Sequence, residues 1–163
     1  MENLYHQIFR AFEAAGVQYL VVGGVAVNLH GYARFTGDLD ILLALDLKNL
    51  QKVASIMGDM GFMNRLPIEL TDLAKEDQVR KWLTEKNMTA FAFISDRLPQ
   101  FSLDVLAAES LRFSELEGRK VVKCASGITI PVVSIDDLVG MKRAANREKD
   151  LEDIEALLEL KGL

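Results

Sequence analysis

The sequence has little of what secreted and membrane proteins need. Only one of its 163 residues is a cysteine, Cys124, so no disulfide can form within the chain. The longest apolar run, Tyr19 to Val27, is interrupted by two glycines and falls far short of the ~20 residues of a membrane-spanning helix. The N-terminus, MENLYHQIFRAFE, is too polar for a signal peptide. We therefore expect a cytoplasmic protein with no membrane partner.

A basic excess, the usual mark of nucleic-acid binding, is also missing. Lysine and arginine number 19 against 24 acidic residues, which gives a net charge of −5. Half of the residues are hydrophobic, 26% are charged and only three are prolines, so the composition is not that of a disordered chain. These values favour a folded, acidic enzyme over a protein that binds nucleic acid by charge alone.

The hydrophobic pattern switches repeatedly between the helical period and the strand period. Helices are expected at residues 2–15, 25–30, 47–60, 70–86, 134–145 and 147–160, and strands at 17–22, 37–44, 88–95, 100–107, 121–124 and 128–132. In the last helix Leu151, Ile154 and Leu158 are expected to face inward. The prediction is one α/β (α+β) domain over residues 1–163, with a core at 17–133 and a C-terminal helical hairpin at 134–163.

Three aspartates interrupt strands that are otherwise apolar. Asp38 and Asp40 share one face of the first strand, because side chains alternate, and their Cα atoms should lie ~6.5–7 Å apart. Asp104 stands between Leu103 and Val105 in a second strand. Like charges on a buried face repel unless a cation lies between them, and hard divalent cations prefer carboxylates. If the strands are neighbours, the three acids suit a pair of Mg²⁺ ions acting on a polyphosphate. A single D-x-D pair also occurs as a turn or helix cap.

A pair of glycines, Gly23 and Gly24, joins a strand to a helix. Glycines there let backbone N–H groups approach an anion closely, and the helix dipole favours negative charge. The spacing matches neither the dinucleotide-binding fingerprint nor the P-loop. Alone the pair is also typical of a turn. Beside the three acids it predicts a phosphate site.

The stretch VVGGVAVNLHGYARFTGDLDI resembles the signature of the DNA polymerase β-like nucleotidyltransferase superfamily. Within that superfamily it is most similar to the abortive-infection type found in toxin–antitoxin pairs. The matching residues are Gly23, Gly24, His30, Gly31, Arg34, Thr36, Asp38 and Asp40, followed by Asp104 and by a C-terminal element of Lys142, Arg147, Lys149, Asp150 and Asp153. The resemblance implies the nucleotidyltransferase fold, with a mixed central sheet flanked by helices.

The resemblance also implies a reaction, in which a hydroxyl attacks the α-phosphorus of a nucleoside triphosphate such as ATP and pyrophosphate leaves. Asp38 and Asp40 would bind two Mg²⁺ ions, with Mn²⁺ as an alternative, and Asp104 would bind the ion that activates the nucleophile. Gly23 and Gly24 would contact the β- and γ-phosphates. The acceptor stays open between tRNA, a protein hydroxyl and a small molecule, and a cognate antitoxin is a further expected partner. Residues 62–99 match no motif and are expected to shape the acceptor site.

Four further residues are weighed between a structural and a functional interpretation. Arg34 either is a surface charge or pairs with Asp38 or a phosphate, and Thr36 lies with it in the nucleotide-binding set. Lys142 is a cation among apolar neighbours, which favours contact with the triphosphate over a solvated face. His30 is expected to pack or cap rather than to bind phosphate.

Two other functions fit parts of the pattern. A non-catalytic binding partner, such as an antitoxin or a regulatory subunit, would be favoured by loss of a carboxylate, but all three are present. A nucleotide-sugar glycosyltransferase would use the D-x-D pair, but Gly23 and Gly24 have no part in that chemistry. We therefore expect a metal-dependent nucleotidyltransferase.

Overall fold

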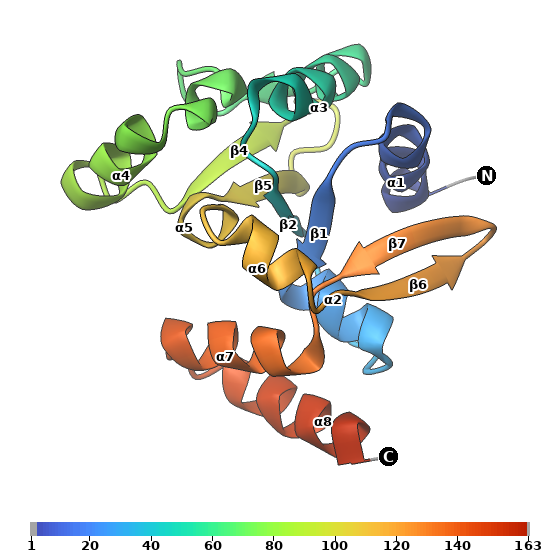
Figure 1. The fold of residues 1–163 in the computed structure, drawn as a ribbon. Helices are drawn as coiled ribbons and strands as arrows, with labels where there is room; N and C mark the ends of the chain where they lie inside the picture. The colour runs from blue at the N-terminus through green and yellow to red at the C-terminus, as the bar shows by residue number, and fades with distance from the viewer. Residues whose placement is uncertain (1–2, 163) are drawn as a thin grey trace.

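A computed structural model of the chain describes residues 3–162, in which strands and helices are interspersed along the sequence and the last two elements are helices (Figure 1). The strands are β1 (Tyr19–Val22), β2 (Leu39–Leu43), β3 (Met63–Asn64), β4 (Ala90–Ile94), β5 (Ser102–Leu106), β6 (Val121–Ala125) and β7 (Ile128–Val132). The helices are α1 (Leu4–Ala15), α2 (Gly23–His30), α3 (Leu47–Asp59), the 3₁₀ helix η1 (Leu70–Ala74), α4 (Glu76–Glu85), α5 (Ala107–Ser110), α6 (Phe113–Glu117), α7 (Ile135–Ala145) and α8 (Asp150–Gly162). The expected α/β class with a C-terminal helix pair is confirmed.

Among the described residues the strands form one mixed sheet in the order β3-β4-β5-β2-β1-β7-β6. Strand β2 runs antiparallel to β1 and parallel to β5, and β1 also pairs with β7 in parallel. In Figure 1, α3 and α4 lie on one side of the sheet, and α2, α7 and α8 lie together on the other. This order places β2, which carries the D-x-D pair, directly beside β5, which carries Asp104.

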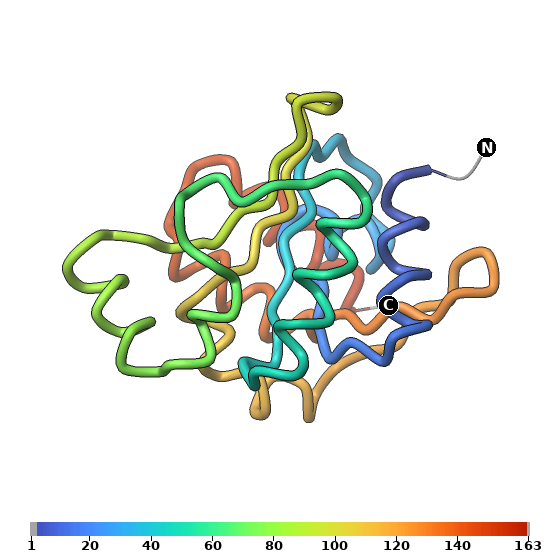
Figure 2. Tube along the Cα trace, turned by 90° about the horizontal axis from the view of Figure 1, so that it is seen from above, coloured from blue at the N-terminus to red at the C-terminus, as the bar shows by residue number. Residues whose placement is uncertain are grey.

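A single cluster of buried apolar side chains fills the space between the sheet and the helices. Helix α1 contributes Ile8, Phe9 and Phe12, which recur at helical spacing on one face. Gly16 ends the helix with a left-handed conformation, φ +69°, that favours glycine. Seen from above, α1 lies beside the β6–β7 hairpin, whereas the segment with η1 and α4 extends away from the centre of the sheet (Figure 2).

The structure differs from the expected elements in the segment between α3 and β4. The single helix expected at residues 70–86 is split into η1 and α4, because Lys75 has an extended conformation, φ −98° and ψ 99°. Glu69 and Asp72 form a capping box around η1, and Glu76 and Asp77 then open α4 with negative charge at its N-terminus. The short elements β3, α5 and α6 had no predicted counterpart.

The inward face of α8 also differs from the prediction. Leu151 and Leu158 are 65% and 43% exposed, and the buried stripe consists of Asp150, Asp153 and Leu157. The spacing of three and four between Asp150, Asp153 and Leu157 places two carboxylates on the inward face of α8, against the buried Lys142 of α7. No helix within residues 3–162 is long and apolar enough to span a membrane.

Candidate active site

The carboxylates of Asp40 and Asp104 come together because β2 and β5 pair in parallel register. Asp40 is the Cα partner of Asp104 across this ladder and the partner of Val22 across the β1–β2 ladder. Both aspartates are half-buried, whereas Asp38 is exposed at the start of β2. The Oδ1 atom of Asp38 accepts a hydrogen bond from the backbone N–H of Ser102, 3.3 Å away, which ties the start of β2 to β5.

Burial and mutual repulsion make this group of carboxylates costly to ionise. Burial raises the pKa of Asp40 to about 6, with further contributions from the charges of Asp104 and Asp38, and the charges of Arg147 and Lys142 oppose the rise. Burial also raises the pKa of Asp104. The Oδ1 atom of Asp104 is buried and has no hydrogen-bond partner. Such a site gains stability when a cation or a donor reaches it.

The glycine pair brings backbone directly against these acids. Gly23 opens α2 with φ +66°, and a Cβ built there would overlap the carboxylate of Asp40. A Cβ on Gly24 would lie 2.6 Å from Oγ1 of Thr36 and 3.3 Å from Nη1 of Arg34. Only glycine fits at Gly23, because a side chain would have to occupy the position of Asp40 and adopt a left-handed backbone.

Lys142 lies on the opposite wall and has two carboxylate partners. Only 4% of the residue is exposed, and Nζ donates to Asp150 Oδ1 at 3.2 Å and to Asp153 Oδ2 at 3.0 Å. Asp150 also accepts from Nε of Arg147 at 2.8 Å. Lys142 is therefore not on a solvated face, because α8 covers it and balances its charge.

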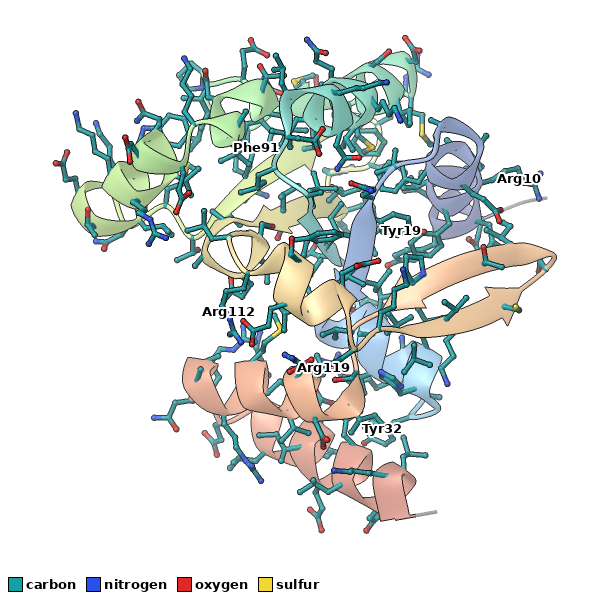
Figure 3. All side chains as sticks on the ribbon, in the orientation of Figure 1. Arg10, Tyr19, Tyr32, Phe91, Arg112 and Arg119 are labelled. Carbon is teal, nitrogen blue, oxygen red and sulfur yellow. The ribbon has the colours of Figure 1, made fainter. Side chains whose placement is uncertain are left out.

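Arg34 is joined to the same pair of helices. Its Nε lies 2.8 Å from Oδ1 of Asp153, and its Nη2 donates to Oδ2 of Asp153 at 2.9 Å, so its ion pair is not with Asp38. Tyr32, at the junction of α2 and α8 in Figure 3, donates a hydrogen bond to Glu152. The loop between α2 and β2 is thus held by α8 at two points.

All eight residues predicted for the site line at least one of two adjoining cavities, of about 480 and 220 Å³. Asp38, Asp40, Gly23 and Lys142 line both; Asp104 lines the larger one. Gly24, Arg34 and Thr36 line the smaller one. Within residues 3–162, however, no three histidine, cysteine or acidic side chains are arranged so that they could hold a metal ion. The chemistry of the donors nevertheless fits a divalent cation, since the carboxylates are unneutralised and one buried oxygen has no partner.

Three residues at this site were not among the predicted binding residues. Arg147 and Lys149 line both cavities and add positive charge opposite the carboxylates. Tyr5 of α1 donates to the carbonyls of Thr36 and Gly37 at 3.3 and 3.4 Å, and burial, then the charges of Asp38 and Asp40, raise the pKa of its hydroxyl. Arg147 and Lys149 could have been found from the resemblance, which includes them. Nothing in the sequence around Tyr5 indicates its role.

His30 has the structural role that was expected of it. Its Nε2 lies 2.8 Å from the carbonyl oxygen of Val133, and burial lowers its pKa. The contact joins the end of α2 to the end of β7.

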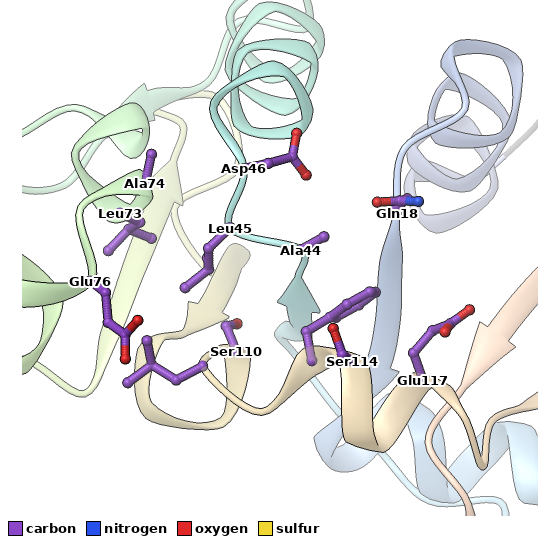
Figure 4. A pocket seen from close by; sticks show the side chains of 12 residues that line it. Gln18, Ala44, Leu45, Asp46, Leu73, Ala74, Glu76, Ser110, Ser114 and Glu117 are labelled. Carbon is purple, nitrogen blue, oxygen red and sulfur yellow. The ribbon is translucent and has the colours of Figure 1, made fainter.

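A separate cavity of about 490 Å³ lies at the other end of β2, where the chain leaves the sheet (Figure 4). Two of its polar groups have structural partners: Asp46 accepts from the N–H of Asn49, and Ser110 accepts from the N–H of Leu43. This cavity shares no lining residue with the carboxylate site, which lies where β2 begins.

Comparisons with known proteins identify the fold. No protein-family model and no curated protein matches the sequence. Among solved structures, the lincosamide antibiotic adenylyltransferase LnuA, bound to lincomycin, is similar over 98% of both chains, with 18% identity and a TM-score of 0.64. ANT(2″)-Ia in complex with adenylyl-2″-tobramycin matches 94% of this chain and 85% of its own, with 16% identity and a TM-score of 0.60. An antigenic nucleotidyltransferase-like protein from Paracoccidioides brasiliensis matches 94% of this chain and 72% of its own, with 15% identity and a TM-score of 0.61. The chain therefore has the fold of the nucleotidyltransferases.

Proposed function

We propose that this protein is a metal-dependent nucleotidyltransferase that moves a nucleoside monophosphate from a nucleoside triphosphate to an acceptor hydroxyl. The observation that carries the proposal is the register of Asp40 with Asp104 beside the Gly23 backbone. This places negative ligands for a cation next to a surface that can approach phosphate. The fold favours nucleotidyl transfer over the glycosyl transfer that a D-x-D pair alone would also fit.

The residues have distinct roles in this reaction. Asp38, Asp40 and Asp104 would hold Mg²⁺ or Mn²⁺, which supplies charge neutralisation at the reacting phosphate. Gly23 and Gly24 leave room for the β- and γ-phosphates, with Thr36 beside Gly24. Arg34, Lys142, Arg147 and Lys149 provide positive charge along the same cavities. Catalysis then consists mainly of positioning and electrostatic stabilisation.

For the nucleotide donor and the acceptor, the proposal uses the two structurally similar proteins as a guide. LnuA is an adenylyltransferase, and the ANT(2″)-Ia structure contains an adenylylated antibiotic. We therefore favour ATP as the donor and a small molecule as the acceptor, ahead of tRNA or a protein hydroxyl. A toxin role and a cognate antitoxin stay predictions of the sequence resemblance alone.

The test is transfer of label from each α-³²P nucleoside triphosphate, with Mg²⁺, to total tRNA, to protein and to a small-molecule extract. We expect label from ATP in the small-molecule fraction, and loss of at least ~100-fold in rate for Asp40→Asn and for Asp104→Asn. Asp59→Asn, an exposed aspartate at the end of α3, is the matched control and should keep full activity. Equal activity of all three variants would exclude the carboxylate site. Nucleotide binding without transfer to any fraction would favour the non-catalytic alternative.

A further inference from the structure

A larger cavity, of about 680 Å³, opens on the other side of Asp104. Its walls come from the loop after β3, from the end of α4 with the turn that follows, and from β4. Asp104, Thr89 and Ala90 line both this cavity and the one that holds Asp38 and Asp40. The two cavities therefore meet at a carboxylate whose Oδ1 atom is buried without a partner.

The cavity exists because β4 alternates small and large side chains. Phe91 and Phe93 point into the core, where their rings pack edge to face with centroids 5.2 Å apart. Ala90 and Ala92 occupy the opposite face, and Ala92 is the Cα partner of Asp104 in the antiparallel β4–β5 ladder. Methyl side chains beside Asp104 leave the space that a longer residue would fill.

The walls of the cavity are held by hydrogen bonds rather than left loose. The N–H of Arg65 donates to the carbonyl of Ala92 at 3.0 Å, and Nδ2 of Asn64 donates to the carbonyl of Ile68 at 2.8 Å. On the other side, the N–H of Met88 donates to the carbonyl of Trp82 at 3.2 Å. These bonds fix both walls around the opening, so the cavity is preformed.

The lining combines an apolar surface with two cations. The apolar side chains are those of Leu66, Pro67, Ile68, Trp82 and Met88, together with Ala90 and Ala92 of β4. Arg65 and Lys86 are exposed, and Asp104 is the single acid in the lining; burial raises its pKa, and the charge of Arg65 opposes the rise. A volume of this size suits a drug-sized molecule, since such sites measure about 300–1,000 Å³. Charge complementarity favours an anionic guest and opposes a polycation.

We propose that this cavity binds the acceptor: a small amphiphilic molecule with an apolar body, an anionic group near Arg65 and Lys86, and a hydroxyl directed to Asp104. The inference rests on the proposed nucleotidyl transfer and names its acceptor class. In that reaction the hydroxyl oxygen forms a bond to the α-phosphorus, and the bond from that phosphorus to the bridging oxygen breaks. The hydroxyl proton passes to the carboxylate of Asp104, and pyrophosphate leaves with the electron pair.

Trp82 allows binding to be measured without any turnover, because it is the only tryptophan in the chain. The ¹⁵N-labelled protein, free of nucleotide and metal, is titrated with three matched probes, and the one indole N–H resonance is followed. The probes are 6-(hydroxymethyl)-2-naphthoate, 2-naphthalenemethanol and 6-(aminomethyl)-2-naphthalenemethanol, which share an apolar body and a hydroxyl but differ in charge. Total tRNA is titrated in parallel.

We expect a saturable shift, with the naphthoate bound at least ~10-fold more tightly than the amine, a difference of about 1.4 kcal/mol. Ala90→Leu should weaken this binding at least ~10-fold by filling the cavity. Ala14→Leu, the same change at an exposed position of α1, should have no effect. Arg65→Ala, which changes an exposed side chain, should remove the preference for the anionic probe even if Ala90→Leu folds poorly.

Four results would overturn the inference. They are no shift with any probe, an unchanged shift in Ala90→Leu, tighter binding of the amine, or a saturable response to tRNA at lower concentration than to the naphthoate. If the proposed nucleotidyl transfer is wrong but the cavity does bind such a molecule, the experiments give a different result. In that case the naphthoate binds at Trp82 as expected, but with ATP and Mg²⁺ no adenylylated product forms.

Discussion

The ammonium of Lys142 lies 3.0 Å from a carboxylate oxygen of Asp153, and both side chains are almost completely buried where α7 packs on α8. Asp150 completes the group at 3.2 Å from the same nitrogen. The pair of helices is therefore joined through a charge cluster and not only through apolar contact. Because Arg34 also binds Asp153, this cluster connects the C-terminal helices to the loop before β2.

Lys142→Ala should lower the free energy of unfolding by up to about 3–5 kcal/mol, because it removes the one buried cation that Asp150 and Asp153 share and leaves them only the more exposed Arg147 and Arg34. Urea denaturation, followed by circular dichroism, measures the change. Arg143→Ala alters the neighbouring but exposed cation and should change stability by no more than about 0.5 kcal/mol. A loss at Lys142 as small as that at Arg143 would mean that the cluster does not stabilise the fold.

Asp40 should make the protein without metal more stable as the pH falls from about 7 toward 5, whereas His30, whose pKa is lowered by burial, opposes this change. The folded pKa of Asp40 is raised to about 6, so the folded state binds the proton more tightly than the unfolded chain does. Stability from this group is present below the raised pKa and is lost as the pH rises through it. The full effect is at most about 3 kcal/mol. Chemical denaturation at several pH values should show the effect of Asp40 as the difference in pH dependence between the wild type or Asp59→Asn and Asp40→Asn, because Asp104 and His30 titrate in all three.

Mg²⁺ with ATP should raise the melting temperature, because both bind the native state at the carboxylates. Asp40→Asn should remove most of this shift, and EDTA should return the wild type to its value without metal. ATP with EDTA is the control for binding that does not need a cation. If Asp40→Asn keeps the whole Mg²⁺-dependent shift, the metal is bound elsewhere.

The carboxylate site could be anticipated because its signals are local in the sequence. Three acids that interrupt two apolar strands favour a cation site over a turn or a helix cap, and the pairing of β2 with β5 places Asp40 beside Asp104. The buried face of α8 could not be anticipated. In the sequence, Asp150 and Asp153 look like the solvent-exposed acids of a surface helix, and only the structure shows that both contact Lys142. The contact of Tyr5 with the loop before Asp38 is likewise long-range and leaves no trace in spacing.

The segment between α3 and β5 was predicted least well, because its structure also depends on contacts between residues that are far apart in the sequence. This segment contains a split helix, η1 and α4, and the two-residue strand β3. Their positions depend on single hydrogen bonds such as that from the N–H of Arg65 to the carbonyl of Ala92. The alternation of alanine and phenylalanine in β4 correctly indicates a strand. Only the structure shows that the alanines face Asp104.

Gly23→Ala should both destabilise the protein and abolish the stabilisation by Mg²⁺ and ATP. A methyl group there overlaps the Asp40 carboxylate and requires φ +66°, and strain of this kind costs about 1–3 kcal/mol. Gly58→Ala is the matched control, because Gly58 lies within α3 with open space around its Cβ position. That change should stabilise the protein by about 0.5–1 kcal/mol, since alanine favours a helix over glycine, and should leave the ligand-induced shift intact. Thermal denaturation of both variants, with and without Mg²⁺ and ATP, makes the comparison. If Gly23→Ala kept the wild-type shift, the approach of the backbone to Asp40 would have no part in nucleotide binding, and the phosphates would have to lie against the cations of α7 and the loop that follows it.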